Sequence, residues 1–222
     1  MGQMRPLRSA LAPADMSFAT TLDPQGTSSP ASLKILHILR APLGGLFRHV
    51  IDLVQGQAKR GHQVGLFIDS TTGGTRAETI LAELAPCLKL GFERAAIPRE
   101  LNPRDIYALH RVSRRIAALK PDVLHGHGAK GAALARLTLN SPQAIRVYTP
   151  HGGSLVYRPG TFSGGFYRTL EWLLKWRTDL FLFESSYVAA LFRAAIGHPP
   201  GIVRVVAFSY SAKFGISAAW AR

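Results

Sequence analysis

Hydrophobic positions along this chain follow two alternating spacings. Short, nearly continuous apolar runs, which are typical of buried strands, lie at 33–39, 62–69, 123–127, 144–149, 180–184 and 202–206. Between these runs, apolar residues recur every three or four positions, which predicts helices at 46–60, 76–84, 103–120, 128–139, 166–177 and 186–195. A weaker pattern indicates a short strand at 88–90. Strands and helices alternate throughout, so the sequence predicts an α/β fold with a doubly wound, mostly parallel, Rossmann-like sheet.

For two of the predicted helices, the sequence predicts which residues are buried in the core. At 103–120 the spacing predicts an inward stripe made of Ile106, Leu109, Val112, Ile116 and Leu119. The aromatic helix at 166–177 is expected to be mostly core, through Phe166, Leu170, Trp172, Leu173, Leu174 and Trp176. Basic residues beside the tryptophans, namely Arg168, Lys175 and Arg177, also allow a role at a membrane surface.

The domain organisation follows from composition. Residues 33–206 suffice for one well-buried domain, whereas 1–32 are rich in Pro, Ser, Thr and Ala and are expected to be a disordered leader. Residues 207–222 have no sustained period and are expected to be an atypical tail. No apolar run approaches the roughly 18 residues of a membrane span.

Charge and cysteine content limit the expected binding partners and cellular location. The formal net charge is +14, which favours nucleic acid, anionic lipid or phosphorylated small molecules as partners. No run of lysine and arginine is dense enough for a nucleic-acid arm, so we expect no nucleic-acid partner. Cys87 is the only cysteine, which excludes an intramolecular disulfide and favours a reducing, cytoplasmic location.

Candidate chemistry gathers where three predicted strands end. Gly44-Gly45 follows the first strand, His125-Gly126-His127-Gly128 closes a central one, and Pro150-His151-Gly152-Gly153 closes the next. Ligands of open parallel sheets bind outside the carboxyl ends of the strands. A glycine turn that opens a helix directs backbone N–H groups toward an anion such as phosphate, although the same turn also occurs without any ligand.

Other readings of these residues remain open. Imidazoles at His125, His127 and His151 suit zinc, but no cysteine or carboxylate lies nearby in sequence to complete a ligand set. Asp69, at the end of the second strand, stands where a nicotinamide-dependent Rossmann enzyme has its ribose-binding acid, although the third glycine of that motif is missing. A third reading is a non-enzymatic basic module that docks on anionic membranes.

Several ordered segments resemble one family. LKILHILRAPLGGLFRHVIDLVQGQAKRGHQV, PDVLHGHGAKGAALARL, VYTPHGG and FYRTLEWLLKWRTDLFLFESSYVAALF together resemble the N-terminal, acceptor-side domain of a GT-B glycosyltransferase of the retaining family 4 type. The resemblance covers about residues 33–206. It implies sugar transfer from a nucleotide sugar to a polysaccharide or glycolipid acceptor, without a metal or other cofactor, at the inner face of the membrane.

The resemblance also implies roles for individual residues. Gly44 and Gly45 would bind the donor phosphates, and His127 would be the catalytic histidine near the reacting sugar. The acceptor side would hold Arg48, His125, His151 and Gly152. His125 is a weaker alternative for the catalytic position.

The last part of the sequence contains no acidic residue, which bears on the donor-binding domain. The family's donor domain contains a pair of glutamates seven residues apart, whereas the last acidic residue here is Glu184. We therefore expect the donor-binding domain to be absent from these 222 residues and the chain alone to be inactive.

Overall fold

The protein is described here by a computed structural model that covers residues 31–100, 102–151, 155 and 162–206. Its strands are β1 (Lys34–Leu39), β2 (Gln63–Asp69), β3 (Phe92–Ala95), β4 (Val123–His127), β5 (Ile145–Thr149), β6 (Leu180–Phe183) and β7 (Ile202–Val205). Its α-helices are α1 (Gly44–Lys59), α2 (Gly74–Leu84), α3 (Arg104–Leu119), α4 (Gly128–Leu137), α5 (Phe162–Leu174) and α6 (Ser186–Ile196). The expected leader, except its last two residues, the expected tail at 207–222, and Gly152 lie outside the described residues.

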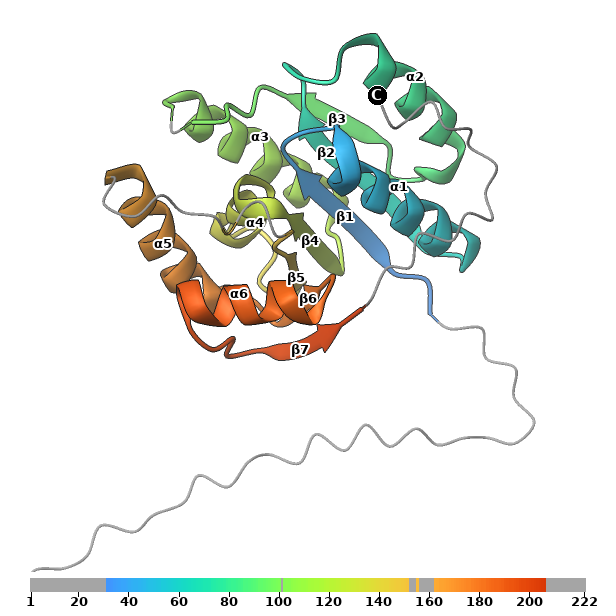
Figure 1. The fold of residues 1–222 in the computed structure, drawn as a ribbon. Coiled ribbons are helices and arrows are strands. Elements are labelled where there is room, and N and C mark those ends of the chain that lie inside the picture. Colours follow the sequence, from blue (N-terminus) through green and yellow to red (C-terminus); the bar gives the residue numbers. More distant parts are fainter. Residues whose placement is uncertain (1–30, 101, 152–154, 156–161, 207–222) are drawn as a thin grey trace, which may run out of the picture. The chain divides into compact units, whose positions relative to one another are not determined.

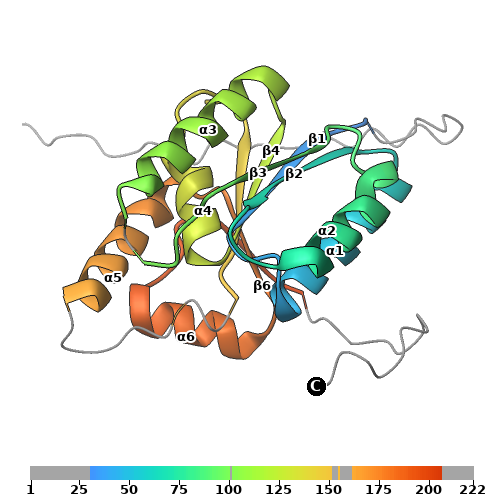
Figure 2. The ribbon, with the colours of Figure 1, turned by 90° about the horizontal axis from the view of Figure 1, so that it is seen from above.

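All seven described strands form one parallel sheet in the order β3-β2-β1-β4-β5-β6-β7 (Figure 1). Viewed from above, α1 and α2 lie on one side of the sheet while α3, α4 and α5 lie on the other (Figure 2). This arrangement confirms the predicted doubly wound fold. It follows from right-handed crossovers, because the chain first moves outward from β1 to β3 and then returns to the opposite side of β1.

The sheet is buried on both faces at its centre. On the α1 and α2 side, β-strand residues pack against the two helices, and this cluster includes Leu39, Val64, Leu66 and Ile68 with Val50, Val54, Leu81 and Leu84. On the α3 and α4 side the cluster includes Leu36, Ile38, Phe67 and Leu124 with Val112, Ile116 and Leu134. Parallel strands covered on both faces need continuous apolar runs, which is why the strand pattern was readable from sequence.

Helix α4 packs unusually close to the strands because two glycines leave room for it. A Cβ at Gly126 of β4 would overlap the backbone of Ala132, and a Cβ at Gly131 of α4 would overlap the backbone of Ile38 in β1. These contacts fix the start of α4 directly beside the ends of β1 and β4.

The third strand was predicted at the wrong place. Residues 88–90 form no strand; they turn at Gly91, whose φ is +68°, and β3 begins at Phe92. The reason is that β3 is an edge strand whose middle residues are polar, since Glu93 pairs with Arg111 at 2.7 Å and Arg94 pairs with Glu78 at 3.4 Å. Its apolar signal is therefore weak.

The predicted stripe of α3 is also partly wrong. Val112 and Ile116 are buried as expected, together with Ala108, but Ile106 is 75% exposed. Ile106 lies in the first turn of the helix, where it lines an apolar surface groove of about 200 Å³ between α3, α4 and α5.

The aromatic helix departs most from expectation. Leu174 is buried, but Phe166, Trp172, Leu173 and Trp176 are between 41% and 66% exposed. The face that α5 turns to the sheet is instead partly polar and contains the buried Glu171. The four exposed residues therefore form a surface, which is called the α5 aromatic face below.

Candidate functional site

The candidate site lies at the carboxyl end of the sheet, where the strand order reverses. Strands β1 and β4 are neighbours, yet α1 leaves β1 on one side of the sheet and α4 leaves β4 on the other. The two connections diverge, and such a switch point is where open α/β sheets bind their ligands. We call this region the switch-point edge; it is formed by Gly44, Gly45, His127 and Gly128.

The glycine turn after β1 has the backbone that the sequence predicted. Gly44 has a φ of +65° and begins α1, and both Gly44 and Gly45 are exposed. No described side chain caps this helix, and its first turn contains no acidic residue. Its first N–H groups and the positive end of its dipole therefore face the switch-point edge, where an anion would be stabilised.

A second helix begins at the same edge. His127 is the N-cap of α4 and makes no side-chain cap hydrogen bond there, and Gly128 follows with a φ of +62°. The first turn of α4 contains no acidic residue either. Two helix N-termini therefore converge on one place, which strengthens its preference for negative charge.

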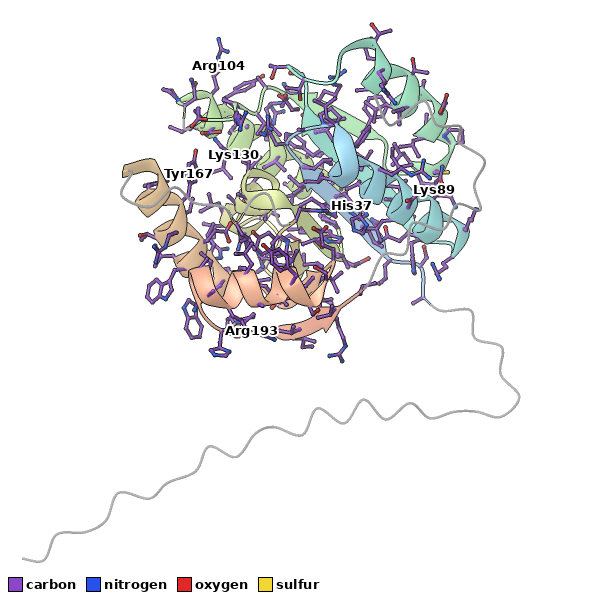
Figure 3. All side chains as sticks on the ribbon, viewed as in Figure 1. His37, Lys89, Arg104, Lys130, Tyr167 and Arg193 are labelled. Atoms are coloured by element: carbon purple, nitrogen blue, oxygen red, sulfur yellow. The ribbon has the colours of Figure 1, made fainter. Side chains whose placement is uncertain are left out.

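Below this edge five histidines from four parts of the chain come together. This histidine cluster consists of His37 of β1, His49 of α1, His125 and His127 of β4, and His151 after β5. Figure 3 labels His37, which lies between β1 and α1, while Arg104 and Arg193 extend from the outside of the fold. The strand register explains part of the cluster, because His37 pairs with His125 and His127 pairs with Thr149.

Hydrogen bonds fix the orientation of His127. Its Nε2 lies 3.0 Å from Nδ1 of His37, and Nε2 of His37 lies 2.8 Å from Oε1 of Gln57 on α1. An amide oxygen only accepts, so His37 donates from Nε2 and accepts at Nδ1. His127 must then donate from Nε2, which leaves its Nδ1 as an acceptor.

Burial keeps these rings neutral. His127 is 1% exposed, and desolvation followed by repulsion from neighbouring histidines lowers its pKa well below the usual value. Desolvation likewise lowers the pKa of His37 to about 4, although its hydrogen bond to Gln57 acts in the opposite direction. The pKa of His49 is also lowered to about 4, mainly by burial. At neutral pH, His127 is therefore an uncharged hydrogen-bonding group with a basic lone pair at Nδ1.

His151 meets this lone pair from the neighbouring strand. Its Nε2 lies 3.4 Å from Nδ1 of His127, and its Nδ1 lies 2.7 Å from Oε2 of Glu184 at the end of β6. His151 has a φ of +54°, a left-handed conformation that a non-glycine residue seldom adopts and that clusters at functional sites. The structure thus brings His127 and His151 together, as the sequence predicted.

The other predicted site residues lie around this centre. His125 precedes His127 by two residues on β4 and is 3% exposed. Its Nε2 lies 2.9 Å from Oγ1 of Thr149. Arg48 projects from α1 and pairs with Asp52 at 3.1 Å. Gly152 lies outside the described residues. The roles expected for these residues, and for Gly44, Gly45, His127 and His151, stay predictions.

Asp69 is occupied by structural hydrogen bonds rather than placed for a ribose. It is fully buried and accepts from the backbone N–H of Ile97 at 2.8 Å and from the hydroxyls of Thr71 and Thr72 at 2.8 and 2.7 Å. These bonds tie the end of β2 to the segment after β3. The position that suggested a nicotinamide enzyme therefore serves the fold.

Four residues of the site were not predicted as such from the sequence: His37, His49, Gln57 and Glu184. His37 was visible only as a polar interruption of an apolar strand. Its meaning depends on β1 and β4 being neighbours in register, and strand order is not encoded in the hydrophobic pattern.

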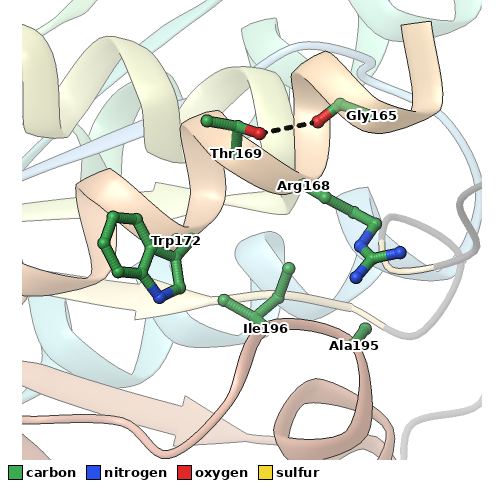
Figure 4. Close-up of a pocket in the computed structure, with 6 residues that line it drawn as sticks. All are labelled: Gly165, Arg168, Thr169, Trp172, Ala195 and Ile196. Carbon is green, nitrogen blue, oxygen red and sulfur yellow. Dashed lines mark hydrogen bonds between the residues drawn. The ribbon is translucent and has the colours of Figure 1, made fainter. Parts of the chain in front are cut away.

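A separate pocket lies away from this edge, between α5 and the end of α6 (Figure 4). It measures about 340 Å³ and is lined by Gly165, Arg168, Thr169, Trp172, Ala195 and Ile196. A guanidinium and an indole therefore border the same hollow, next to the α5 aromatic face. None of the helices in the described part of the chain is long and apolar enough to cross a membrane.

Solved structures of three proteins share this fold. A glycosyltransferase from Rickettsia africae superposes with a TM-score of 0.58 at 17% identity, covering 79% of this chain and 43% of its own. Anabaena HepE, solved with UDP and glucose, superposes with a TM-score of 0.56 at 17% identity, covering 80% of this chain and 45% of HepE. MurG from Acinetobacter baumannii superposes with a TM-score of 0.52 at 15% identity, covering 80% of this chain and 45% of MurG. The chain thus spans less than half the length of each.

Sequence comparison defines the family. No curated protein is similar enough in sequence to match this chain. The model of Glycosyltransferase Family 4, however, matches residues 43–207, which is most of the chain and includes the whole switch-point edge. The chain therefore belongs to Glycosyltransferase Family 4.

Proposed function

We propose that this chain is the acceptor-side part of a GT-B glycosyltransferase that moves a sugar from a nucleotide sugar to a glycan or lipid-linked acceptor. The observation that carries the proposal is the meeting of two helix N-termini and the neutral His127 at the switch-point edge, in a member of Glycosyltransferase Family 4. The acceptor oxygen would bond to the anomeric carbon as the bond from that carbon to the phosphate oxygen breaks. The acceptor proton would leave on the nucleoside diphosphate.

In this proposal Gly44 and Gly45 contact the donor phosphates. The departing diphosphate gains negative charge in the transition state, and preoriented N–H groups stabilise that charge without reorganising. A side chain at Gly44 would meet no neighbouring atom, so the glycine is required for its φ of +65°. The preference for glycine is thus a requirement of the turn that presents these N–H groups.

His127 would act as the catalytic histidine. Because His37 fixes its Nε2 proton, Nδ1 is the nitrogen left to accept a hydrogen bond, and a sugar hydroxyl there would replace its 3.4 Å contact with Nε2 of His151. A neutral ring makes this contact without placing a positive charge beside the reacting carbon. Retention of the anomeric configuration belongs to this proposal through the family resemblance.

The acceptor would approach from the side of Arg48 and His151. Among the described residues Arg48 forms a surface ion pair with Asp52, which an anionic acceptor can replace at little cost. His125 would act from beneath, by supporting the His127 ring at a centroid distance of 4.0 Å, and Gly152 would continue the acceptor turn.

The test is a binding titration of the purified 222-residue chain with nucleotide sugars, repeated with His127→Asn, Gly44→Val and the control His198→Asn, beside a transfer assay with lipid-linked acceptors in which we expect no turnover by the chain alone. We expect binding of a nucleotide sugar that the first two variants weaken and the control preserves. If the folded chain binds no nucleotide sugar but NADH quenches its tryptophan fluorescence, the proposal is wrong and the nicotinamide alternative holds.

We further propose that the protein contacts anionic membrane, peripherally and on the cytoplasmic side. The α5 aromatic face supports this, because Trp172, which lines the Arg168 pocket, and Trp176 are both exposed, and indole rings favour the membrane–water interface. The net charge of +14 suits an anionic surface. Lys175 is not part of this contact, because it is buried with its Nζ 3.3 Å from the carbonyl of Ile196.

Vesicle flotation tests the membrane contact. We expect binding to anionic but not neutral vesicles, and loss of binding in Trp172→Ser/Trp176→Ser. Leu139→Ser is the matched control, since Leu139 is 72% exposed and lies outside α5. Equal binding to neutral and anionic vesicles would contradict an electrostatic contact.

A further inference from the structure

Three histidines of the cluster bring nitrogen atoms close together. Ligand atoms of His49, His127 and His151 all lie within 4.8 Å of one another. His127 and His151 are mostly buried, whereas His49 is only partly buried, so His49 is the member of this group that solvent reaches most easily. Imidazole nitrogen is a common ligand of zinc and of neighbouring transition metals.

The distance between the facing nitrogens of His127 and His151 is long for a hydrogen bond and close to the separation of two ligands on a tetrahedral metal ion. Their facing nitrogens, Nδ1 and Nε2, are 3.4 Å apart. Two ligands of a tetrahedral zinc with Zn–N bonds of about 2.0–2.1 Å are separated by about 3.3 Å. A cation could therefore sit between these two rings with little movement of either.

Both rings are also oriented as metal ligands are. A ligating histidine commonly donates its other N–H to a carboxylate, a carbonyl or another fixed acceptor. Nδ1 of His151 lies 2.7 Å from the carboxylate of Glu184, which leaves Nε2 as the ligand atom. Nε2 of His127 donates to His37, which leaves Nδ1 as the ligand atom. The two nitrogens named as ligand atoms are therefore the same two that face each other at 3.4 Å.

We propose that His49, His127 and His151 form a three-histidine site for Zn²⁺ or a similar transition-metal ion, with Glu184 and His37 as positioning residues. Water would complete a tetrahedral ligand set. Hard cations such as Mg²⁺ prefer oxygen ligands and would not compete.

A second triad, His37, His125 and His127, is less suitable. Its ligand atoms are equally close, but all three side chains are buried. Its nitrogens are engaged inside the fold, since His37 bonds to His127 at 3.0 Å and to Gln57 at 2.8 Å, and His125 bonds to Thr149 at 2.9 Å. A metal there would have to break these bonds without an entry path.

Metal binding would have a consequence that rests on the proposed function. The ion would occupy Nδ1 of His127, the atom proposed to contact the sugar, so it would inhibit transfer rather than assist it. The site itself does not depend on that function, because binding can be measured without any sugar.

The experiment is a titration of the untagged, chelator-treated chain with Zn²⁺ by calorimetry and with Co²⁺ by visible absorption. We expect one ion per chain and the intense visible bands of four-coordinate Co²⁺. His49→Asn and His151→Asn should abolish those bands, and Glu184→Gln should weaken Zn²⁺ binding about 10- to 100-fold. The exposed His198→Asn is the control and should bind as the native chain does.

Ring ¹⁵N spectra of the native chain give a result that depends on no variant. Zn²⁺ should shift Nδ1 of His127 and Nε2 of His151. The proposal is overturned if the Co²⁺ bands are weak, as in six-coordinate complexes, if Zn²⁺ shifts only the exposed histidines, or if folded His49→Asn and His151→Asn proteins bind with unchanged affinity.

Discussion

His37 and His127 lie on adjacent parallel strands, and their rings are joined by a hydrogen bond of 3.0 Å between Nδ1 of His37 and Nε2 of His127. A buried bond between two neutral imidazoles has a direction, and Gln57 sets it by accepting from the far side of His37 at 2.8 Å. The amide of Gln57 on α1 thus determines which nitrogen of His127 donates and which one accepts.

This chain of bonds predicts the tautomer of two histidines. In metal-free protein at neutral pH, both His37 and His127 should carry their proton on Nε2, because Gln57 Oε1 only accepts. Long-range ¹H–¹⁵N ring spectra measure this directly. Gln57→Leu removes the acceptor and should give a mixture of tautomers at His127, whereas Gln55→Leu, an exposed neighbour on the same helix, should change nothing. A pure Nδ1–H form of His127 in the native chain would contradict the assignment.

A second prediction concerns the close packing of α4. Gly131→Ala should destabilise the fold by about 1–3 kcal/mol, because the added Cβ would overlap the Ile38 backbone and force α4 away from β1. Gly165→Ala in α5 is the control, since its Cβ would meet nothing and alanine favours a helix by up to about 1 kcal/mol. Urea unfolding measures both changes. Equal stability of the two variants would show that α4 can shift freely.

A third prediction concerns the buried ion pair beneath α5. Nη2 of Arg136 lies 2.8 Å from Oε1 of Glu171, and both side chains are at most 4% exposed. Glu171→Leu should cost about 3–5 kcal/mol, because it leaves the guanidinium buried without this carboxylate. The double variant Arg136→Met/Glu171→Leu should be more stable than Glu171→Leu alone. If it is less stable than Glu171→Leu alone, Arg136 stabilises the fold through its other contacts, with the carbonyl of Ala132 and the ring of Tyr148.

The exposed pair of Arg48 and Asp52 is the matched comparison. It spans one helical turn at 3.1 Å with side chains 28% and 54% exposed. Asp52→Asn should therefore change the free energy of unfolding by no more than about 0.5 kcal/mol.

A fourth prediction is an acid dependence of stability that arises from Asp69. Burial alone would raise the pKa of this carboxyl, but hydrogen bonds from Ile97, Thr72 and Thr71 outweigh it and lower the pKa. A lowered pKa stabilises the fold above the unfolded value of about 3.9, and this stabilisation is lost as the pH falls through the folded pKa. The difference in unfolding free energy between native protein and Asp69→Asn should thus shrink below about pH 4. A constant difference from neutral to acid pH would rule out this role.

The sequence predicted the repeated strand–helix order well because strands buried on both faces must be apolar throughout. It also located Gly44, Gly45, His127 and His151, since glycines and histidines at strand ends are visible without knowing the fold. Edge strand β3 was misplaced because Glu93 and Arg94 make ion pairs instead of core contacts. The α5 aromatic face was misjudged because the inward side of this helix is partly polar, with Glu171 buried, and periodicity assigns the more apolar side to the core.

The partners of His127 could not be predicted for a different reason. His37 and Gln57 are 20 residues apart, and His37 and His127 are 90 apart, so their meeting depends on strand order and register. Those are set by packing of the whole sheet.

The central claim is that the switch-point edge binds the nucleotide sugar. The most direct measurement is a ¹H–¹⁵N titration of the folded 222-residue chain with UDP-sugars and other nucleotide sugars, followed at the amides of Gly44, Gly45 and Gly128 and at the ring of His127. We expect one nucleotide sugar to shift these four signals together, and Gly44→Val to remove the response without unfolding the protein. The claim is contradicted if the folded chain shows no shift at these positions up to millimolar ligand, or if the shifts gather elsewhere on the fold.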